Sequence, residues 1–170
     1  MQPMLIERYT VKDYEQWEGE WELVEGVPYA MAPAPVGKHQ WVMMRLGAFL
    51  NRELEECREC YVLGDAEWRV SKDTVVRPDV MVTCGDLVDF VSRRPEIVIE
   101  IVSPSTKLRD EVMKKELCRR EGVPCFALVY PDDEKVRFFK LTLGEYREEE
   151  PSFEICGKKI ELDIDYIFRR

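Results

Sequence analysis

The stretch EIVIEIV, residues 96–102, constrains the fold most, because so short an apolar run is typical of a strand buried on both faces. SPST at 103–106 breaks the chain, and a helix is predicted over about 107–121, with Gly122 as its C-terminal cap. A second buried strand, CFALVY, occupies 125–130. We expect these elements to form one parallel, right-handed crossover in an open sheet, where sites tend to lie beyond the carboxyl ends of the strands.

An acidic residue interrupts the first of these apolar strands. Glu100 lies within it, between Ile99 and Ile101. An isolated ionised carboxylate is costly in such a place, so Glu100 must be paired, protonated or bound to a metal ion. Glu100 is therefore a candidate functional residue.

The rest of the chain predicts more strand than helix, within a single domain over residues 1–170. The predicted elements are, in order, a short helix at 11–17, two strands within 22–32 around the Glu25-Gly26 turn, a helix over about 38–56, strands at 60–70, 74–83 and 135–143, and a hairpin at 153–164 around Gly157. No repeat, low-complexity tract or linker divides the sequence. These elements indicate an α/β fold of the mixed α+β kind, with a mixed central β-sheet flanked by helices.

Charge and hydropathy restrict the partners. The 170 residues carry a formal net charge of −9, which does not favour sequence-independent adsorption to phosphate backbones. Any nucleic-acid contact must therefore be local or bridged by metal cations. No apolar run approaches the ~18 residues of a membrane span, and the first residues lack the pattern of a signal peptide, so we expect no membrane partner.

The cysteines indicate a reducing compartment. They are Cys57, Cys60, Cys84, Cys118, Cys125 and Cys156. Their scattered placement is unlike a small secreted disulfide scaffold, so we expect reduced cysteines and a cytoplasmic protein. The close pair in CREC, 57–60, could suggest metal or redox chemistry. It lacks a second pair at zinc spacing, so we interpret it as two ordinary neighbours at a helix end.

Two acids could form a metal site. Asp79 follows Pro78 at the start of a predicted strand, and Glu100 lies late in the next one. If these strands are neighbours, the two carboxylates converge, and Mg²⁺ is commonly held by one or two carboxylates plus waters and substrate phosphate. The alternatives are a turn or strand-edge role for Asp79 and a buried ion pair for Glu100.

The helix after Glu100 supplies a third part. Asp110 and Lys114 are four residues apart and share one face, with Lys107 one turn earlier. A lysine near a metal-bound water could position it or stabilise charge on a phosphoryl oxygen. On spacing alone, a solvated charged face is the simpler interpretation.

These residues also resemble a known family. The segments RPDVMV and IVIEIVSPSTKLRDEVMKKELCRREGV, with WELVEGVPYAMAPAPVGKHQWVMMRL upstream, are similar to the Uma-two family of restriction endonuclease-like proteins. That family belongs to the PD-(D/E)XK nuclease superfamily. The resemblance covers about residues 21–141 and implies a restriction endonuclease-like core.

The resemblance also implies site residues. Asp79 and Glu100 match the metal-binding acids, with Ile101 beside them in the metal-binding set. The superfamily lysine two residues after the second acid is absent, because that position is Val102. The resemblance implies that the following helix supplies this lysine instead, and Lys114 matches that place.

The resemblance extends to further residues around these. Asp110 matches a residue that would orient Lys114, and Lys115 is a weaker candidate for the lysine role. Glu22 matches an upstream glutamate with a catalytic role as an outer metal ligand, and His39 matches a family histidine.

Two functions of different classes follow. The first is a Mg²⁺-dependent endonuclease hydrolysing DNA phosphodiester bonds, with Mn²⁺ as substitute metal, Lys114 positioning the water and a homodimer to cleave both strands. The second is a catalytically inactive nuclease-fold module acting as a dimeric interaction protein, in which Glu100 and Lys114 form a structural ion pair. RNA or another phosphate ester would use the same residues as the first.

Overall fold

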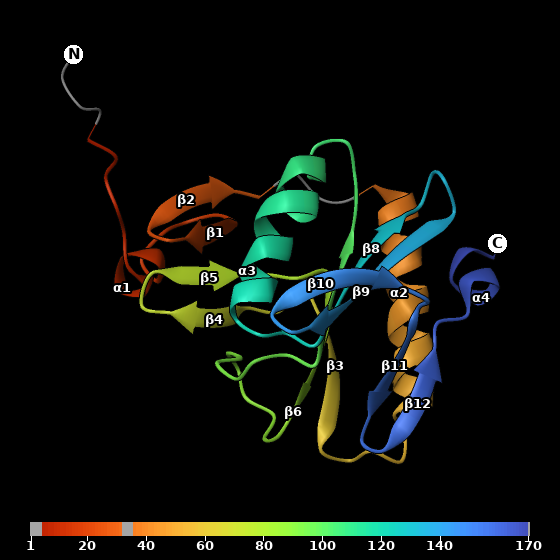
Figure 1. Cartoon of the computed structure of the whole chain (residues 1–170). Coiled ribbons are helices and arrows are strands. Elements are labelled where there is room, and N and C mark those ends of the chain that lie inside the picture. The colour runs from red at the N-terminus through yellow and green to blue at the C-terminus, as the bar shows by residue number, and fades with distance from the viewer. Residues whose placement is uncertain (1–4, 32–35, 170) are drawn as a thin grey trace.

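A computed structural model describes residues 5–31 and 36–169, and its centre is a six-stranded mixed sheet (Figure 1). The strand order is β10 (Glu145–Glu149), β9 (Lys135–Thr142), β8 (Cys125–Tyr130), β7 (Ile97–Ile101), β6 (Val80–Cys84) and β3 (Cys60–Gly64). β7 and β8 are parallel, and every other neighbouring pair is antiparallel. The parallel pair is the predicted crossover.

A second, four-stranded antiparallel sheet lies beside the first, next to the short helix α1 (Val11–Tyr14) (Figure 1). Its order is β2 (Val27–Ala30), β1 (Trp21–Val24), β5 (Thr74–Val76) and β4 (Trp68–Ser71). The chain passes from β3 in the first sheet to β4 in the second, and returns from β5 to β6. β1 is thereby held next to the segment that precedes β6.

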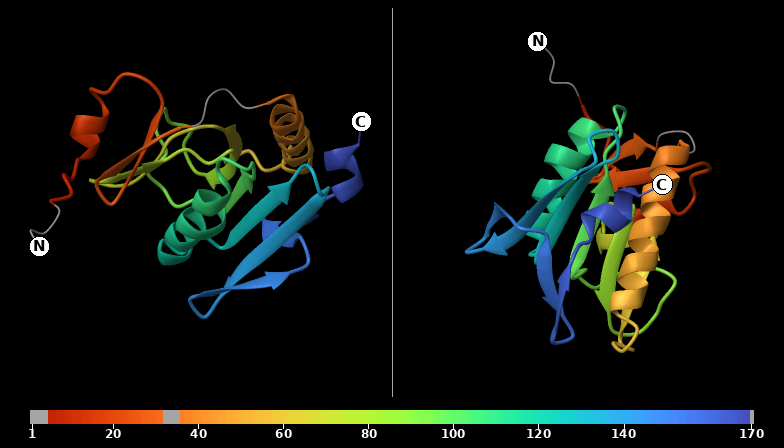
Figure 2. Two further views of the ribbon diagram at one scale, coloured as in Figure 1. Left: turned by 90° about the horizontal axis from the view of Figure 1, so that it is seen from above. Right: turned by 90° about the vertical axis from the view of Figure 1, so that its right-hand side faces the viewer.

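Helices cover both faces of the six-stranded sheet (Figure 2). On one face lie α2 (Gly37–Glu53), α4 (Ile164–Phe168) and a hairpin of β11 (Ser152–Ile155) and β12 (Lys158–Glu161). The other face carries a π-helical turn, η1 (Arg109–Lys114), which α3 (Lys115–Arg120) continues. None of the described helices combines the length and apolarity needed to cross a bilayer.

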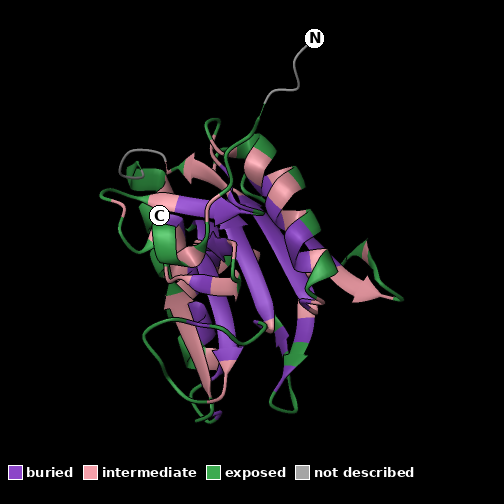
Figure 3. Cartoon of the chain, turned by 90° about the vertical axis from the view of Figure 1, so that its left-hand side faces the viewer, coloured by how far each residue is buried: buried purple, intermediate pink, exposed green. Residues whose placement is uncertain are grey.

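The alternation of side chains along β7 assigns each face its core. Ile97, Ile99 and Ile101 pack with the α2 side, whereas Val98 packs with Leu117 on the α3 side. All five β7 residues are buried, and the central strands form the buried middle of the molecule (Figure 3). Glu100 belongs to the α3 side, because it shares the parity of Val98.

Most predicted elements are confirmed, and four differ. The segments 60–70 and 74–83 were each expected as one strand, but each divides between the two sheets. The short connections 65–67 and 77–79 separate the halves and let the chain change sheets. β10 and α4 were not predicted, because β10 is mostly exposed and polar and α4 is too short to show a helical period.

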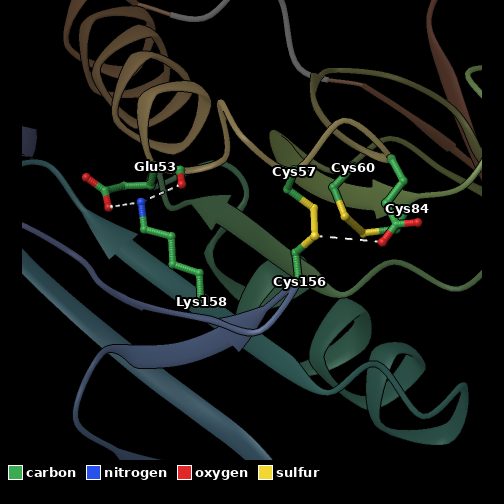
Figure 4. The surroundings of a disulfide bond; sticks show 7 residues. Glu53, Cys57, Cys60, Cys84, Cys156 and Lys158 are labelled. Atoms are coloured by element: carbon green, nitrogen blue, oxygen red, sulfur yellow. Dashed lines mark hydrogen bonds and ion pairs between the residues drawn. A yellow bond between two sulfur atoms is a disulfide. The ribbon is translucent and has the colours of Figure 1, made fainter.

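The expectation of reduced cysteines is wrong for four of the six. Disulfides join Cys57 to Cys156 and Cys60 to Cys84, as Figure 4 shows. Cys118 and Cys125 are free and buried. The interpretation of CREC as helix neighbours is also wrong, because α2 ends at Glu53 and each cysteine pairs with a distant segment. Sequence separations of 99 and 24 residues hide both pairings from local patterns.

The tight turn between β1 and β2 yields a stability prediction. Gly26 has φ +80°, and a Cβ there would lie 2.9 Å from Arg8 Cβ and 3.2 Å from Tyr9 O. Gly144 has φ +79°, but a Cβ there would meet no atom within 4 Å. We expect Gly144→Ala to cost about 1–2 kcal/mol for its left-handed backbone alone. Gly26→Ala should cost clearly more, since the backbone of Tyr9 must also shift.

Urea unfolding followed by circular dichroism gives the midpoint of each variant. The midpoints can be compared directly if the unfolding free energy depends on urea concentration with the same slope in both variants. Equal midpoints for the two would show that the contact of Gly26 with Tyr9 contributes nothing.

Candidate active site

Every charged side chain that is buried among the described residues lies in one cleft. The four are Glu22, Glu100, Asp110 and Lys114. The cleft has a volume of about 610 Å³ and is also lined by His39 and Asp79. Its walls come from β1, the start of α2, the ends of β6 and β7, and η1. Since buried charge is costly unless compensated, its concentration at one place marks this cleft as the candidate site.

The antiparallel pairing of β6 and β7 brings the two predicted acids together. Val80 pairs with Ile99, so the start of β6 lies beside the end of β7. Ile101 N–H donates to Oδ2 of Asp79 at 2.7 Å, and Asp79 N–H lies 3.4 Å from Oε2 of Glu100. The two carboxylates therefore share one end of the sheet, as the sequence predicted.

Lys114 reaches from η1 to both sheets. Its Nζ lies 2.9 Å from Oε1 of Glu22 on β1 and 3.1 Å from Oε1 of Glu100 on β7. A weaker contact runs from Nζ to the main-chain oxygen of Arg77, at 3.5 Å. Asp110 is also buried in η1, so the predicted pair does share a face, although the turn is π-helical. Such turns frequently occur at functional sites.

His39 approaches the same point from the first turn of α2. Its Nε2 lies 3.2 Å from Oδ1 of Asp79. Burial opposes the charged form of each group, but their mutual contact outweighs it. The pKa of His39 is raised and the pKa of Asp79 is lowered. The structure therefore joins the only histidine to the predicted acids.

The electrostatics of the other buried groups follow from burial and crowding. Burial raises the pKa of Glu100 well above its ordinary value, and neighbouring carboxylates add to this although Lys114 opposes it. Burial likewise raises the pKa of Asp110, to about 6. For Lys114, burial alone would lower the pKa, but the carboxylates, Glu100 foremost, outweigh it and raise it. Lys114 is therefore a cation held among acids.

The acids outnumber the bases at this point. Four carboxylates, those of Glu22, Asp79, Glu100 and Asp110, face the two basic side chains of Lys114 and His39. Oε2 of Glu22, Oδ2 of Asp110 and Nδ1 of His39 are buried without a hydrogen-bond partner among the described residues. Excess negative charge and free carboxylate oxygens are what a hard divalent cation requires, so these residues fit a Mg²⁺-type ion.

Some candidates contribute differently from the expectation. The side chain of Ile101 is buried in the core on the α2 side, so only its main chain reaches the site. Lys107 is exposed and does not line the cleft. Lys115 is directed elsewhere, with Nζ 3.8 Å from the centroid of the Phe139 ring. Val102 is buried and packs on the α3 side.

The sequence reasoning missed several lining residues. Arg77 forms ion pairs with Glu20 and Asp65, and all three line the cleft. Ser105, Thr106 and Arg109 also belong to the lining. Arg77 stands in the RPD segment, and the other three lie between Glu100 and Lys114, so proximity to the recognised motif was the available signal.

Comparisons with known proteins identify the fold and the family of the chain. The chain resembles the crystal structure of a putative nuclease belonging to DUF820 from Anabaena variabilis ATCC 29413, with a TM-score of 0.77 and 19% identity over 94% of this chain and 97% of that one. This likeness confirms the nuclease-type mixed α/β fold. A search of curated proteins found no match. Residues 11–155 match the Uma2 family, described as "Putative restriction endonuclease", and the chain belongs to that family.

Proposed function

We propose that this chain is a metal-dependent endonuclease that hydrolyses DNA phosphodiester bonds in the cleft. The observation that carries the proposal is the group of four carboxylates around Lys114 and His39, three of them buried, which has more negative than positive charge and retains free oxygens. Family membership supports the reaction class. The fold of the Anabaena protein supports the architecture.

Asp79 and Glu100 would hold the metal, with Mg²⁺ as the expected ion and Mn²⁺ as its substitute. Ile101 has no ligand atom in its side chain, so its main-chain carbonyl oxygen is the group that would take part. Glu22 would act as an outer ligand through its free Oε2. When bound, the ion would lower the pKa of a water molecule and polarise the scissile phosphate.

The remaining residues position groups and carry protons. Lys114 is held by Glu22 and Glu100 and would orient the attacking water and stabilise charge on the phosphoryl oxygens. Asp110 lies one turn away on η1 and would help to hold Lys114 in place. His39 donates from Nε2 to Asp79, which keeps that carboxylate ionised and directed into the cleft.

The rim offers contacts for a nucleic-acid backbone despite the charge of −9. The hydroxyls of Ser105 and Thr106 and the guanidinium of Arg109 line the cleft, and such groups commonly bind phosphate oxygens. They would supply the local contact that an acidic chain requires. RNA or another phosphate ester would contact the same groups. The substrate assay therefore includes these compounds as well as DNA.

One observation favours a second candidate function, a catalytically inactive module. Lys114 already neutralises Glu100 and Glu22 at 3.1 and 2.9 Å, as a structural ion pair would. This pairing leaves the free oxygens of Asp110 and Glu22 unexplained, because a purely structural network would satisfy them. The two candidates differ in whether a metal ion binds.

Metal binding can be tested with an isosteric change. Asp79→Asn keeps the acceptor oxygen for Ile101 N–H but removes the charge. We expect titration calorimetry to show Mg²⁺ and Mn²⁺ binding by the wild type, weakened at least about tenfold in this variant. Asp132→Asn is the matched control, because Asp132 is exposed at the β8–β9 turn. Unchanged affinity in folded Asp79→Asn would contradict the proposed site.

The role of Lys114 can be tested by removing its charge. Without metal, Lys114→Met leaves buried carboxylates uncompensated, so we expect a loss of about 3–5 kcal/mol in the free energy of unfolding. Mg²⁺ should restore part of this stability, while cleavage of duplex DNA falls about 10²–10³-fold. Urea unfolding with and without Mg²⁺, and a plasmid-nicking assay, measure the two effects.

Lys115→Met is the control, since its ammonium lies over Phe139 outside the cleft. Two results together would favour the inactive module. The first is a stability loss in Lys114→Met that Mg²⁺ does not reduce, and the second is a wild type that does not cleave DNA.

Double-strand cleavage would be served by a twofold dimer, which presents one site to each strand. We therefore expect a homodimer in sedimentation velocity at working concentration. A monomer that still cuts both strands of a duplex would contradict this expectation.

A further inference from the structure

Four cysteines meet at one place although they come from four separate segments. Cys57 follows α2, Cys60 begins β3, Cys84 ends β6 and Cys156 lies in the turn between β11 and β12. The two disulfides that they form lie side by side (Figure 4). None of the four lines the cleft, so they form a second cluster separate from the candidate active site.

The sulfur atoms are close enough to share one ion. The Sγ atoms of Cys57, Cys60 and Cys156 all lie within 4.8 Å of one another, and the Sγ of Cys84 is bonded to that of Cys60. Zinc–sulfur bonds of about 2.3 Å place the sulfurs of a tetrahedral site roughly 3.8 Å apart. Once both disulfides are opened, the four sulfurs therefore lie within the range that one such site spans.

The backbone arranges these positions independently of any disulfide. Cys60 N–H donates to Cys57 O at 3.2 Å, which makes a tight turn within a C-x₂-C pair, the spacing of structural zinc sites. Cys60 pairs directly with Cys84 in the β3–β6 register. Arg93 donates from Nη1 to the main-chain oxygen of Cys84 at 2.7 Å, which helps to fix the main chain at the end of β6. Three ligand positions are thereby held by the turn that follows α2 and by the strands β3 and β6.

We propose that these four cysteines, in their reduced form, are a tetrathiolate site for one Zn²⁺ ion. Each disulfide takes up two electrons and two protons from a thiol reductant, which becomes a disulfide itself. The four thiols then release four protons as their sulfurs bind the ion. If the surroundings of the chain are reducing, disulfides such as these seldom persist, and cysteines that converge are then typical of metal sites. Four thiolates in tetrahedral array select zinc.

The site would fasten the C-terminal hairpin to the sheet. β11 and β12 form a sheet of their own, with no strand pairing to the six-stranded sheet. The hairpin is held instead by the buried residues Phe153, Ile155 and Ile160, and by an ion pair of Lys158 with Glu53 at 3.2 Å. A zinc–sulfur bond to Cys156 would link the turn between β11 and β12 to the other three cysteines. The free energy of zinc binding would then stabilise the fold.

The other two cysteines provide internal controls. Cys118 and Cys125 are buried and take part in neither disulfide, and burial raises the pKa of both thiols, to about 11 for Cys125. Neither sulfur belongs to the group of cysteine sulfurs that lie within 4.8 Å of one another.

The test uses the whole chain, reduced and kept without oxygen. It is made with Asp79→Asn, so that metal binding in the cleft is weakened. We expect one zinc per chain by elemental analysis, and thiolate-to-metal charge-transfer absorption after Co²⁺ replaces zinc. Four cysteines should resist alkylation until a chelator is added. Cys156→Ser should weaken zinc binding at least about tenfold, while Cys125→Ser binds as its parent does.

Two results on the Asp79→Asn chain, which carries all six cysteines, would contradict the proposed zinc site. Neither depends on whether a cysteine variant folds. One is a reduced chain without zinc whose four clustered cysteines react freely. The other is two disulfides that persist in the presence of thiol reductant. Neither result bears on the nuclease proposal, because thiol counting and charge-transfer absorption report only on sulfur.

Discussion

A single ammonium group, that of Lys114, joins three parts of the molecule. It lies within 3.1 Å of a carboxylate on β1 in the small sheet and of another on β7 in the large sheet, and it belongs to η1. Because all three groups are buried, separating any one of them would leave charge without compensation in the interior. The position of β1 beside the large sheet therefore depends on the same contacts that form the cleft. Stability and the proposed chemistry share these atoms.

Glu100 illustrates how much of the site can be predicted from the sequence alone. An acid in a strand buried on both faces requires compensation whatever the fold, so the sequence alone marked it. The crossover from β7 to β8 was equally readable, because each strand is short, apolar and bounded by breakers. Convergence of Asp79 with Glu100 needed only that β6 and β7 be neighbours. Lys114 was different, since spacing favoured a solvated helix face and only the family resemblance indicated its role.

What could not be predicted depends on long-range pairing. The segments 60–70 and 74–83 have the composition of single strands, and nothing local shows that each crosses from one sheet to the other. The cysteine pairs are separated by 99 and 24 residues, so no spacing pattern reports them. Arg77 and Asp65 reach the cleft for the same reason, as both lie in the connections between the sheets. Tertiary contact decided these features, whereas local pattern decided the strands.

The π-helical turn has a consequence for the geometry of the helix as a whole. Such a turn is in effect an α-helix that carries one inserted residue, which shifts the phase of everything beyond it. Within the π-helical turn, Asp110 and Lys114 point toward acids from two sheets. Beyond it, Leu117 and Cys118 of α3 point into an apolar core. An uninterrupted α-helix of this sequence would satisfy one of these faces and rotate the other out of register. The inserted residue thus changes the rotation of α3 about the helix axis relative to η1, so that one helix can contact a polar surface and an apolar surface that lie in different directions.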